Sequence, residues 1–316
     1  MMWQKIIGIL EKSGAVAAGI AEAGLVEDNA WRAYLDWVDN HCNAGMRYME
    51  NYPDIRRDAR LLIEGAKSII SMAFPFKPSV FRDDGKGMIA CYAYGEDYHD
   101  VIRKRLTVAV KEITDLFGGN HRICIDSAPV MERYWAVKAG IGERGDNGSV
   151  IVPGTGSMAF LAEIATTLKL GVESGFAGPW HKSTGPNRCT HCQVCTRRCP
   201  GGAIRPDGTV DARRCISYLS IEHRGPWIDN EALEAMATPE GRNIIFGCDL
   251  CLRICPLNTS IPPTPLPEFQ PSEKILQLTK AEIAEMDQDR FSRFFKGSAI
   301  KRCKLNGIKR NIGLNP

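Results

Sequence analysis

The sequence predicts an α+β protein with a large N-terminal α/β domain, a small cysteine-rich module and a short basic helical tail. Three observations predict this order. Helix-like and strand-like apolar patterns alternate over residues 1–178. Eight of the twelve cysteines fall within residues 179–262. The last part, residues 263–316, begins within a proline-rich stretch at residues 261–267, and basic side chains accumulate toward its end.

Length and composition limit the classes of protein that fit. A chain of 316 residues with 44% hydrophobic content can bury one large core and a small module. The net charge of +3 is too small to indicate a nucleic-acid-binding protein by itself. No apolar run is long enough to cross a bilayer, and the N-terminus lacks the apolar segment of a signal peptide. We therefore expect a protein without a membrane segment.

The first part of the chain mixes helical and strand patterns. Apolar and small residues at helical spacing predict a helix over residues 3–26, and a second helix follows over residues 30–49. A β-branched run predicts a buried strand over residues 67–74, which ends at a proline. Another strand is expected over residues 89–94.

Clearer patterns follow in the second half of the N-terminal domain. Residues 101–117 form an amphipathic helical pattern, and residues 122–126 are typical of a short strand. Residues 130–139 predict a helix. A further helix is expected over residues 157–168, with Ser157 as its N-cap.

Glycines are concentrated over residues 140–156. They do not form a dinucleotide-binding motif, because no G-x-G-x-x-G opens a helix after a strand. Two interpretations remain open. The glycines form tight turns, or they allow the backbone to lie against a large flat ligand, as only glycine permits.

Two cysteine runs indicate iron–sulfur chemistry. The first has the spacing C-x2-C-x2-C-x3-C-P, the bacterial run for 4Fe–4S clusters in which the fourth cysteine serves the other cluster. The second run lacks one cysteine, and an isolated cysteine between the runs completes the number. We expect one cluster on Cys189, Cys192, Cys195 and Cys255, and a second on Cys199, Cys215, Cys248 and Cys251.

Zinc and disulfides explain the cysteines less well. Structural zinc takes four ligands, usually as two separated C-x2-C pairs, and does not require the proline that follows each run. Disulfides need an oxidising compartment, to which nothing in the sequence directs the chain. The four other cysteines are isolated and predict buried small side chains: Cys42, Cys91, Cys124 and Cys303. The clusters indicate the reducing cytoplasm.

Several segments make the chain resemble the epoxyqueuosine reductase family, the cobalamin- and iron–sulfur-dependent enzymes of tRNA queuosine synthesis, which are related to reductive dehalogenases. The resemblance extends from about Tyr48 to Asn311. Its most specific segments are Gly65-Ala-Lys-Ser-Ile-Ile70, Tyr92-Ala-Tyr-Gly-Glu-Asp-Tyr-His99, Asp126-Ser-Ala-Pro-Val-Met-Glu-Arg133, Arg214-Cys-Ile-Ser-Tyr-Leu219 and Gly247-Cys-Asp-Leu-Cys251.

The resemblance implies a cofactor and a catalytic residue. Asp126 matches the family's proton donor, and cobalamin is expected in the α/β domain. The implied cobalamin contacts are Arg57, Ala90, Asp126, Val150, Ser157, Leu161 and Ser217. To act as an acid near neutral pH, Asp126 needs a raised pKa, which we expect burial against the corrin ring of cobalamin to provide. The alternative role for Asp126 is that of a strand-end carboxylate capping the next turn.

Two features depart from the family pattern. Where the family has a Gly-Trp-Ile-Gly-Lys-Asn type of sequence, this chain has Gly142-Glu-Arg-Gly-Asp-Asn147. The chain also ends at Pro316, without the helical-repeat extension of longer members, so we expect tRNA contacts from the core and from the tail. The basic residues of the tail are Lys296, Lys301, Arg302, Lys304, Lys309 and Arg310.

The implied function is reduction of epoxyqueuosine to queuosine at the tRNA wobble position. Its partners would be tRNAs with queuosine-family anticodons and an external low-potential electron donor, and the protein is expected to be a monomer. None of the six histidines has a typical cobalt-binding context, so cobalamin is expected without a histidine ligand. His99, which comes nearest, is interpreted as a loop or substrate-side residue.

Two alternatives remain open. One is a reductive dehalogenase-like enzyme that uses the same cofactors on a small molecule. The other is a plain electron-transfer ferredoxin, which the long segment of residues 1–178 before the cysteine runs disfavours.

Overall fold

The computed structural model describes residues 2–171 and 189–313. The longer helices are α1 (Met2–Lys12), α2 (Asp28–Asp39), α4 (Tyr98–Phe117), α5 (Glu132–Lys138), α8 (Asn230–Ala237), α13 (Gln288–Phe294) and α14 (Lys304–Asn311). The shorter ones are α3 (Pro53–Arg57), α6 (Val194–Arg197), α7 (Ile216–Ile221), α9 (Pro239–Asn243), α10 (Leu250–Arg253), α11 (Glu273–Gln277) and α12 (Lys280–Ala284). The strands are β1 (Ala17–Glu22), β2 (Ser68–Pro75), β3 (Met88–Ile89), β4 (His121–Cys124), β5 (Glu143–Arg144), β6 (Val150–Ile151), β7 (Ala159–Thr166) and β8 (Ile244–Phe246).

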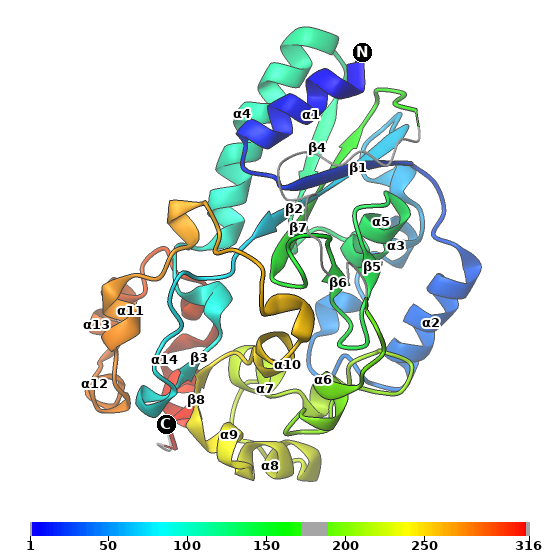
Figure 1. Cartoon of the computed structure of the whole chain (residues 1–316). Coiled ribbons are helices and arrows are strands. Elements are labelled where there is room, and N and C mark those ends of the chain that lie inside the picture. The colour runs from blue at the N-terminus through cyan, green and yellow to red at the C-terminus, as the bar shows by residue number, and fades with distance from the viewer. Residues whose placement is uncertain (1, 172–188, 314–316) are drawn as a thin grey trace.

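An antiparallel sheet of order β1-β2-β7-β4 forms the centre of the N-terminal domain. Strands β1, β2 and β7 are mostly buried, because helices α1 and α4 cover one face and α5 and α2 lie on the other (Figure 1). The edge strand β4 is only half-buried. Side chains alternate between these faces along each strand. The loop after β4 and the start of α4 meet beyond one end of this sheet, where the candidate site lies.

The cysteine module joins the N-terminal domain through a small parallel sheet. Strand β3 from the N-terminal half pairs with β8, which directly precedes the second cysteine run. Helices α6 and α10 begin within the first and second cysteine runs, and they pack against each other. The side chain of Asp249 accepts a hydrogen bond from the Cys91 backbone N–H at 2.8 Å, which ties the second run to the N-terminal domain.

The C-terminal segment packs into the largest hydrophobic core. Phe291, Phe295 and Ile308 from this segment are buried in the same cluster as α4 and β2. Arg310 is 7% exposed and donates to the backbone oxygens of His223, Gly225 and Leu219. Arg310 is therefore a structural residue that joins the tail to the cysteine module.

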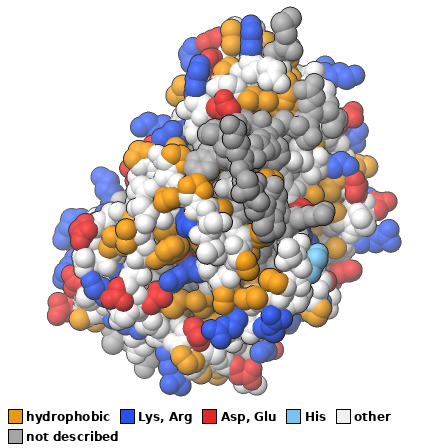
Figure 2. Space-filling view, in the orientation of Figure 1, with side chains coloured by type: hydrophobic (Ala, Val, Ile, Leu, Met, Phe, Trp, Pro, Cys, Tyr) orange, Lys and Arg blue, Asp and Glu red, His pale blue; other side chains and the backbone are white. Residues whose placement is uncertain are grey.

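Charged side chains are mixed on the visible surface. Figure 2 shows Lys and Arg side chains interspersed with Asp and Glu side chains on this face. The small net charge of +3 agrees with this distribution. Across the described residues, no helix has the length and apolar character needed to cross a membrane.

The structure corrects the prediction of one N-terminal helix. The helix ends at Lys12, and residues 17–22 form strand β1 instead. Gly14 adopts a φ of +96°, which breaks the helix. Gly19 then lies so close to α5 that an added Cβ would stand 2.1 Å from the Ala139 oxygen. The small residues of this stretch serve close packing of a strand.

Three further elements differ from the sequence-based prediction. The second helix ends at Asp39, because His41 and Ala44 adopt left-handed conformations. The expected strand over residues 89–94 is two residues long and turns into a 3-10 helix at Cys91–Ala93. The expected helix over residues 157–168 is the central strand β7, hydrogen-bonded on both sides.

Candidate active site and cluster module

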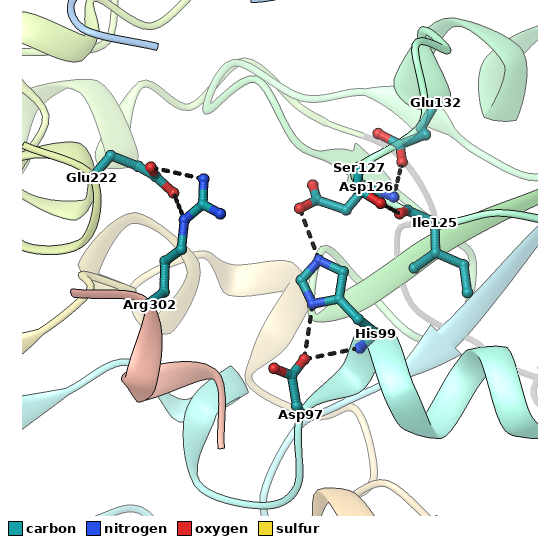
Figure 3. A network of polar contacts seen from close by, with 8 residues as sticks. All are labelled: Asp97, His99, Ile125, Asp126, Ser127, Glu132, Glu222 and Arg302. Carbon is teal, nitrogen blue, oxygen red and sulfur yellow. Dashed lines mark hydrogen bonds and ion pairs between the residues drawn. The ribbon is translucent and has the colours of Figure 1, made fainter. Parts of the chain in front are cut away.

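Asp126 and His99 form the centre of the candidate active site (Figure 3). Asp126 follows β4, and His99 lies in the first turn of α4. The Nε2 atom of His99 is 3.0 Å from Asp126 Oδ2, and its Nδ1 atom is 2.8 Å from Asp97 Oδ1. Asp97 also caps α4 by accepting from the His99 backbone N–H at 3.1 Å. One imidazole is thus held between two carboxylates.

This arrangement sets the protonation of the pair. Burial alone lowers the pKa of His99, but the hydrogen bonds to Asp126 and Asp97 outweigh burial and raise the pKa of His99 to about 9. Partial loss of hydration among the surrounding protein atoms raises the pKa of Asp126, yet hydrogen bonds from His99 and the charge of that imidazole bring this pKa below its usual value. In the protein alone, His99 therefore holds the proton, and the rise in the Asp126 pKa expected from burial against cobalamin stays a prediction.

Aromatic packing fixes the imidazole while leaving the carboxylate accessible. The ring of Tyr98 stacks on His99, with ring centres 4.0 Å apart, and on Phe160 at 4.3 Å. The side chain of Asp126 is 61% exposed, whereas that of His99 is 34% exposed. A substrate can therefore contact Asp126 directly, with His99 behind it.

The backbone around Asp126 has an unusual conformation. Asp126 has a φ of 49°, in the left-handed region, and its N–H donates to the Glu132 carboxylate at the start of α5. The hydroxyl of Ser127 bonds to the Ile125 oxygen at 3.2 Å within this turn. The Asp126 carboxylate itself bonds to His99 on another element, which favours a functional role over turn capping.

A second polar pair faces Asp126 across the site (Figure 3). Arg302 binds Glu222 through two bonds, Nε to Oε1 at 2.9 Å and Nη2 to Oε2 at 3.0 Å. The Arg302 guanidinium also lies 5.9 Å from the ring centre of Tyr48. This arginine was predicted only as part of the basic tail, and the structure places it at the candidate site.

The residues expected to contact cobalamin occupy different environments. Arg57 forms an ion pair with Asp28 at 2.8 Å, and its guanidinium lies 5.5 Å from the Trp31 ring centre. Ala90 is buried and its N–H donates to the Phe246 oxygen at 2.8 Å. Ser217 is partly buried in α7. No hydrogen bond or ion pair joins Arg57, Ala90 and Ser217 to one another, and their roles in binding cobalamin stay predictions.

The segment from β6 to β7 carries the other expected contacts. Val150 and Leu161 pack in one hydrophobic cluster. Ser157 is not a helix N-cap, because its hydroxyl accepts from Asn258 Nδ2 at 2.9 Å and its N–H donates to Asn258 Oδ1 at 2.8 Å. In the loop before Ser157, the buried Thr155 hydroxyl has no hydrogen-bond partner among the described residues. An unpaired polar atom in this loop fits a bound group with hydrogen-bonding edges, as cobalamin has.

The glycines of residues 140–156 serve turns and close contacts within the protein. Gly140, Gly148 and Gly154 adopt positive φ angles. An added Cβ at Gly156 would stand 2.0 Å from Asn258 Oδ1, and one at Gly142 would stand 2.4 Å from the Ile151 oxygen. At these positions the tight-turn interpretation accounts for the glycines.

The structure brings the eight motif cysteines together in two groups. One pocket is lined by the first expected set: Cys189, Cys192, Cys195 and Cys255. The second set consists of Cys199, Cys215, Cys248 and Cys251. Burial raises the pKa of the Cys251 thiol most, and the charges of Cys215 and Cys199 come next, so these thiols lie near one another. The division of ligands between two clusters stays a prediction that this grouping supports. The four isolated cysteines are buried, as expected.

The charged loop that departs from the family pattern holds the first cysteine run. Glu143 Oε1 accepts from the Cys189 backbone N–H at 2.7 Å. Asp146 accepts from His191 Nδ1 at 2.7 Å and from Gln193 Nε2 at 2.9 Å. Because Glu143 replaces an apolar residue and Asp146 replaces a lysine of the family pattern, this loop forms polar contacts with the cluster-binding run.

Sequence reasoning missed several residues around Asp126. Glu222, which binds Arg302, gave no motif, and Glu132 appeared only as part of a longer family segment. The Asp97-Tyr-His99 sequence was a usable signal, because an N-cap aspartate two residues before a histidine can bond to its ring.

Comparisons with known proteins agree with these features. A family model for epoxyqueuosine reductase QueG, DUF1730, matches residues 56–127, and a model for a 4Fe–4S double cluster binding domain matches residues 188–258. Epoxyqueuosine reductase from Cyclobacterium marinum is 38% identical over 95% of this chain and 92% of its own length. The Vibrio cholerae enzyme is 31% identical over 95% of this chain and 78% of its own length.

Solved structures share the fold. An epoxyqueuosine reductase crystallised with a tRNA-Tyr epoxyqueuosine-modified tRNA stem loop gives a TM-score of 0.85 at 24% identity, covering 99% of this chain and 80% of that one. The Streptococcus thermophilus enzyme gives 0.83 at 25% identity, covering 98% and 79%. A Bacillus subtilis enzyme, whose catalytic aspartate loop is swung out of the active site, gives 0.81 at 23% identity, covering 99% and 81%.

The mixed fold and the double cluster domain define an iron–sulfur oxidoreductase. The chain belongs to the epoxyqueuosine reductase family. This membership removes the plain electron-carrier alternative.

Proposed function

We propose that this protein reduces epoxyqueuosine in tRNA to queuosine, using two 4Fe–4S clusters and cobalamin, with Asp126 as the proton donor. Its 38% identity to an epoxyqueuosine reductase over nearly the whole chain carries the proposal. The exposed Asp126 carboxylate, backed by His99, supplies the acid that the reaction needs.

The reaction requires two electrons and two protons for each oxygen removed as water. Cobalamin supplies a low-potential cobalt centre when bound, and the clusters pass electrons singly. Both His99 ring nitrogens are engaged by Asp97 and Asp126, so the imidazole is not free to coordinate cobalt. This supports cobalamin bound without a histidine ligand.

The first proton comes from the His99–Asp126 pair. In the free protein the proton resides on His99, because the pKa of His99 is about 9 and that of Asp126 is low. When substrate displaces water from Asp126, the charged pair loses its hydration, and burial favours two neutral partners. The proton then passes from Nε2 to Oδ2 along this hydrogen bond, whose two heavy atoms lie 3.0 Å apart, and Asp126 delivers it to the departing oxygen.

The substrate and partners follow from the same proposal. A tRNA substrate and eight cysteine thiols both favour the reducing cytoplasm. Arg302, which faces Asp126, and Tyr48, whose ring lies beside the Arg302 guanidinium, are suited to contact an unpaired base of an anticodon loop. We expect tRNAs with queuosine-family anticodons, an external low-potential electron donor and a monomeric protein.

An in vitro conversion tests the proposal. Protein with both clusters is loaded with cobalamin, reduced chemically and mixed with epoxyqueuosine-containing stem-loop RNA, and the nucleosides are measured by mass spectrometry. We expect queuosine only when cobalamin is present. A halogenated aromatic compound serves as the matched alternative substrate. Dehalogenation without epoxyqueuosine reduction would replace the proposal with the dehalogenase-like alternative.

A further inference from the structure

A buried asparagine joins the second cysteine run to the turn that precedes β7. Asn258 follows Cys255 by three positions and is 3% exposed. Its Oδ1 atom accepts from the Ser157 N–H at 2.8 Å, and its Nδ2 atom donates to the Ser157 hydroxyl at 2.9 Å. The same Nδ2 atom donates to the Leu252 oxygen in α10 at 2.7 Å. One amide side chain is therefore bonded to the turn and to the cysteine run at once.

The backbone of Asn258 is also held in place. Its N–H donates to the Cys255 oxygen at 2.9 Å, and its oxygen accepts from the Lys77 ammonium at 3.0 Å. Lys77 donates further to the oxygens of Thr259 at 3.1 Å and Ile261 at 2.7 Å. Hydrogen bonds from a charged donor are stronger than neutral ones. Lys77 therefore fixes the segment from which the Asn258 side chain extends.

The turn fits closely against this amide. Gly156 has a φ of +62°, and its N–H donates to the Val152 oxygen at 2.8 Å, which closes the turn. An added Cβ at Gly156 would stand 2.0 Å from Asn258 Oδ1 and 2.9 Å from the Leu257 oxygen. Any side chain at position 156 would therefore push the turn away from Asn258.

Two hydroxyl groups of this turn have unused hydrogen-bonding capacity. The Ser157 hydroxyl accepts from Asn258, and a hydroxyl also has a proton of its own to donate. Within the described part of the chain this proton has no acceptor, and the buried Thr155 hydroxyl has no partner at all. Buried polar groups normally find partners, so both hydroxyls fit a bound group with hydrogen-bonding edges.

We propose that Asn258 is a positioning residue that aims the Ser157 hydroxyl at cobalamin and fixes this contact relative to the second cysteine run. By donating to the hydroxyl oxygen, Asn258 leaves the hydroxyl proton for an amide oxygen of the cofactor. By binding the Leu252 oxygen as well, it holds the cofactor contact and the cluster ligands as one unit. The inference rests on the proposed function, because cobalamin must be the cofactor.

Replacing Asn258 by Ala or by Asp separates aiming of the hydroxyl from support of the turn. Asn258→Ala removes all three side-chain bonds. Asn258→Asp keeps an oxygen for the Ser157 N–H, but it cannot donate to Leu252, and its carboxylate draws the Ser157 hydroxyl proton toward itself. Since groups that orient a ligand of a metal site change affinity about 10–100-fold when removed, both variants should bind cob(II)alamin more weakly by this factor. The measurement is an absorbance titration of cluster-loaded protein with cob(II)alamin.

Asn311 offers a matched control elsewhere in the fold. It is also 3% exposed, and its Nδ2 atom donates to the oxygens of Ser220 at 2.8 Å and Ile245 at 2.9 Å. Asn311→Ala should lower the denaturation midpoint as Asn258→Ala does, but it should bind cob(II)alamin as the native protein does. Equal weakening in the two alanine variants would assign the effect to general loss of stability and would overturn the inference.

Hydrogen exchange of the Ser157 amide gives a readout without the cofactor. In cluster-loaded, cobalamin-free protein this amide should exchange faster in Asn258→Ala and remain slow in Asn258→Asp, because only aspartate keeps its acceptor. Weak cobalamin binding by Asn258→Asp despite slow exchange is the result specific to aiming of the hydroxyl. Native cobalamin affinity in Asn258→Asp would overturn the inference.

A second variant decides the matter if Asn258→Ala fails to retain its clusters. Gly156→Ala displaces the turn from Asn258 without changing the cysteine run, so it should retain native iron content and bind cob(II)alamin more weakly. Native affinity in Gly156→Ala would overturn the inference. Absence of cobalamin binding by the native protein would instead overturn the proposed function, and this inference with it.

Discussion

Replacing Asp126 by Asn tests the proton donor most sharply. Asn has nearly the same shape as Asp, and its side chain can still form a hydrogen bond with His99 Nε2, which lies 3.0 Å from Asp126 Oδ2 in the native protein. It has no acidic proton to deliver. General acid catalysis contributes about 10²–10⁴-fold, so the single-turnover rate should fall by this factor, or about 3–5 kcal/mol of transition-state stabilisation.

The same change also removes one of the two carboxylates that hold the His99 proton. The native pKa of His99 is about 9, and in Asp126→Asn it should fall, since only Asp97 remains as a charged partner. The native rate should therefore decline as the pH rises through about 9, where His99 loses its proton. In the variant the residual rate should show no decline at this pH.

The assay is single-turnover conversion of epoxyqueuosine stem-loop RNA under chemical reductant, followed from pH 6 to 10. Cluster absorbance, cobalamin binding and RNA affinity serve as controls and should match the native protein. A native conversion rate in Asp126→Asn would show that the proton comes from another group. A lowered rate with lost cobalamin binding would instead assign Asp126 a binding role.

The other predictions concern the cofactors and the tail. Cys215→Ala should lower the iron content from about eight atoms to about four per chain, measured by iron analysis and paramagnetic resonance, and retention of both clusters would refute the assigned ligands. Bound cob(II)alamin should show no nitrogen splitting from an imidazole, because both ring nitrogens of His99 are engaged, and such splitting would contradict this. Charge reversal of the exposed Lys301 and Lys304 should weaken RNA binding. It should also reduce the slope of log binding constant against log salt concentration by about 0.7 for each lost phosphate contact, and an unchanged slope would show that these lysines do not contact phosphates. Arg310→Ala should instead destabilise the fold by about 3 kcal/mol in denaturant titration, since three backbone oxygens lose a charged donor, and a native midpoint would contradict its structural role.

The local patterns of the chain predicted part of the fold. The helix over residues 101–117 appears nearly as expected because its apolar residues keep a helical period, and the strand over 67–74 because its apolar run is short, continuous and β-branched. The prediction of a helix over residues 157–168 was wrong, because alanine and leucine favour helices and only pairing with β2 and β4 makes this segment a strand. The buried Glu163 in that strand has no local signature.

The candidate site shows the same division. The cysteine groups were predictable because cluster ligation imposes fixed local spacing. The strand-end position of Asp126 was also visible in the sequence. Its partners were not, since His99 and Glu132 come from different helices and meet Asp126 only in the folded chain. The lowered pKa of Asp126 in the protein alone depends on that meeting.

The central claim is tested most directly by nucleoside analysis of tRNA from a strain that lacks this protein. Epoxyqueuosine should accumulate and queuosine should disappear, and the native gene, but not the Asp126→Asn variant, should restore queuosine. An unchanged queuosine content in the strain without the protein would contradict the proposed function.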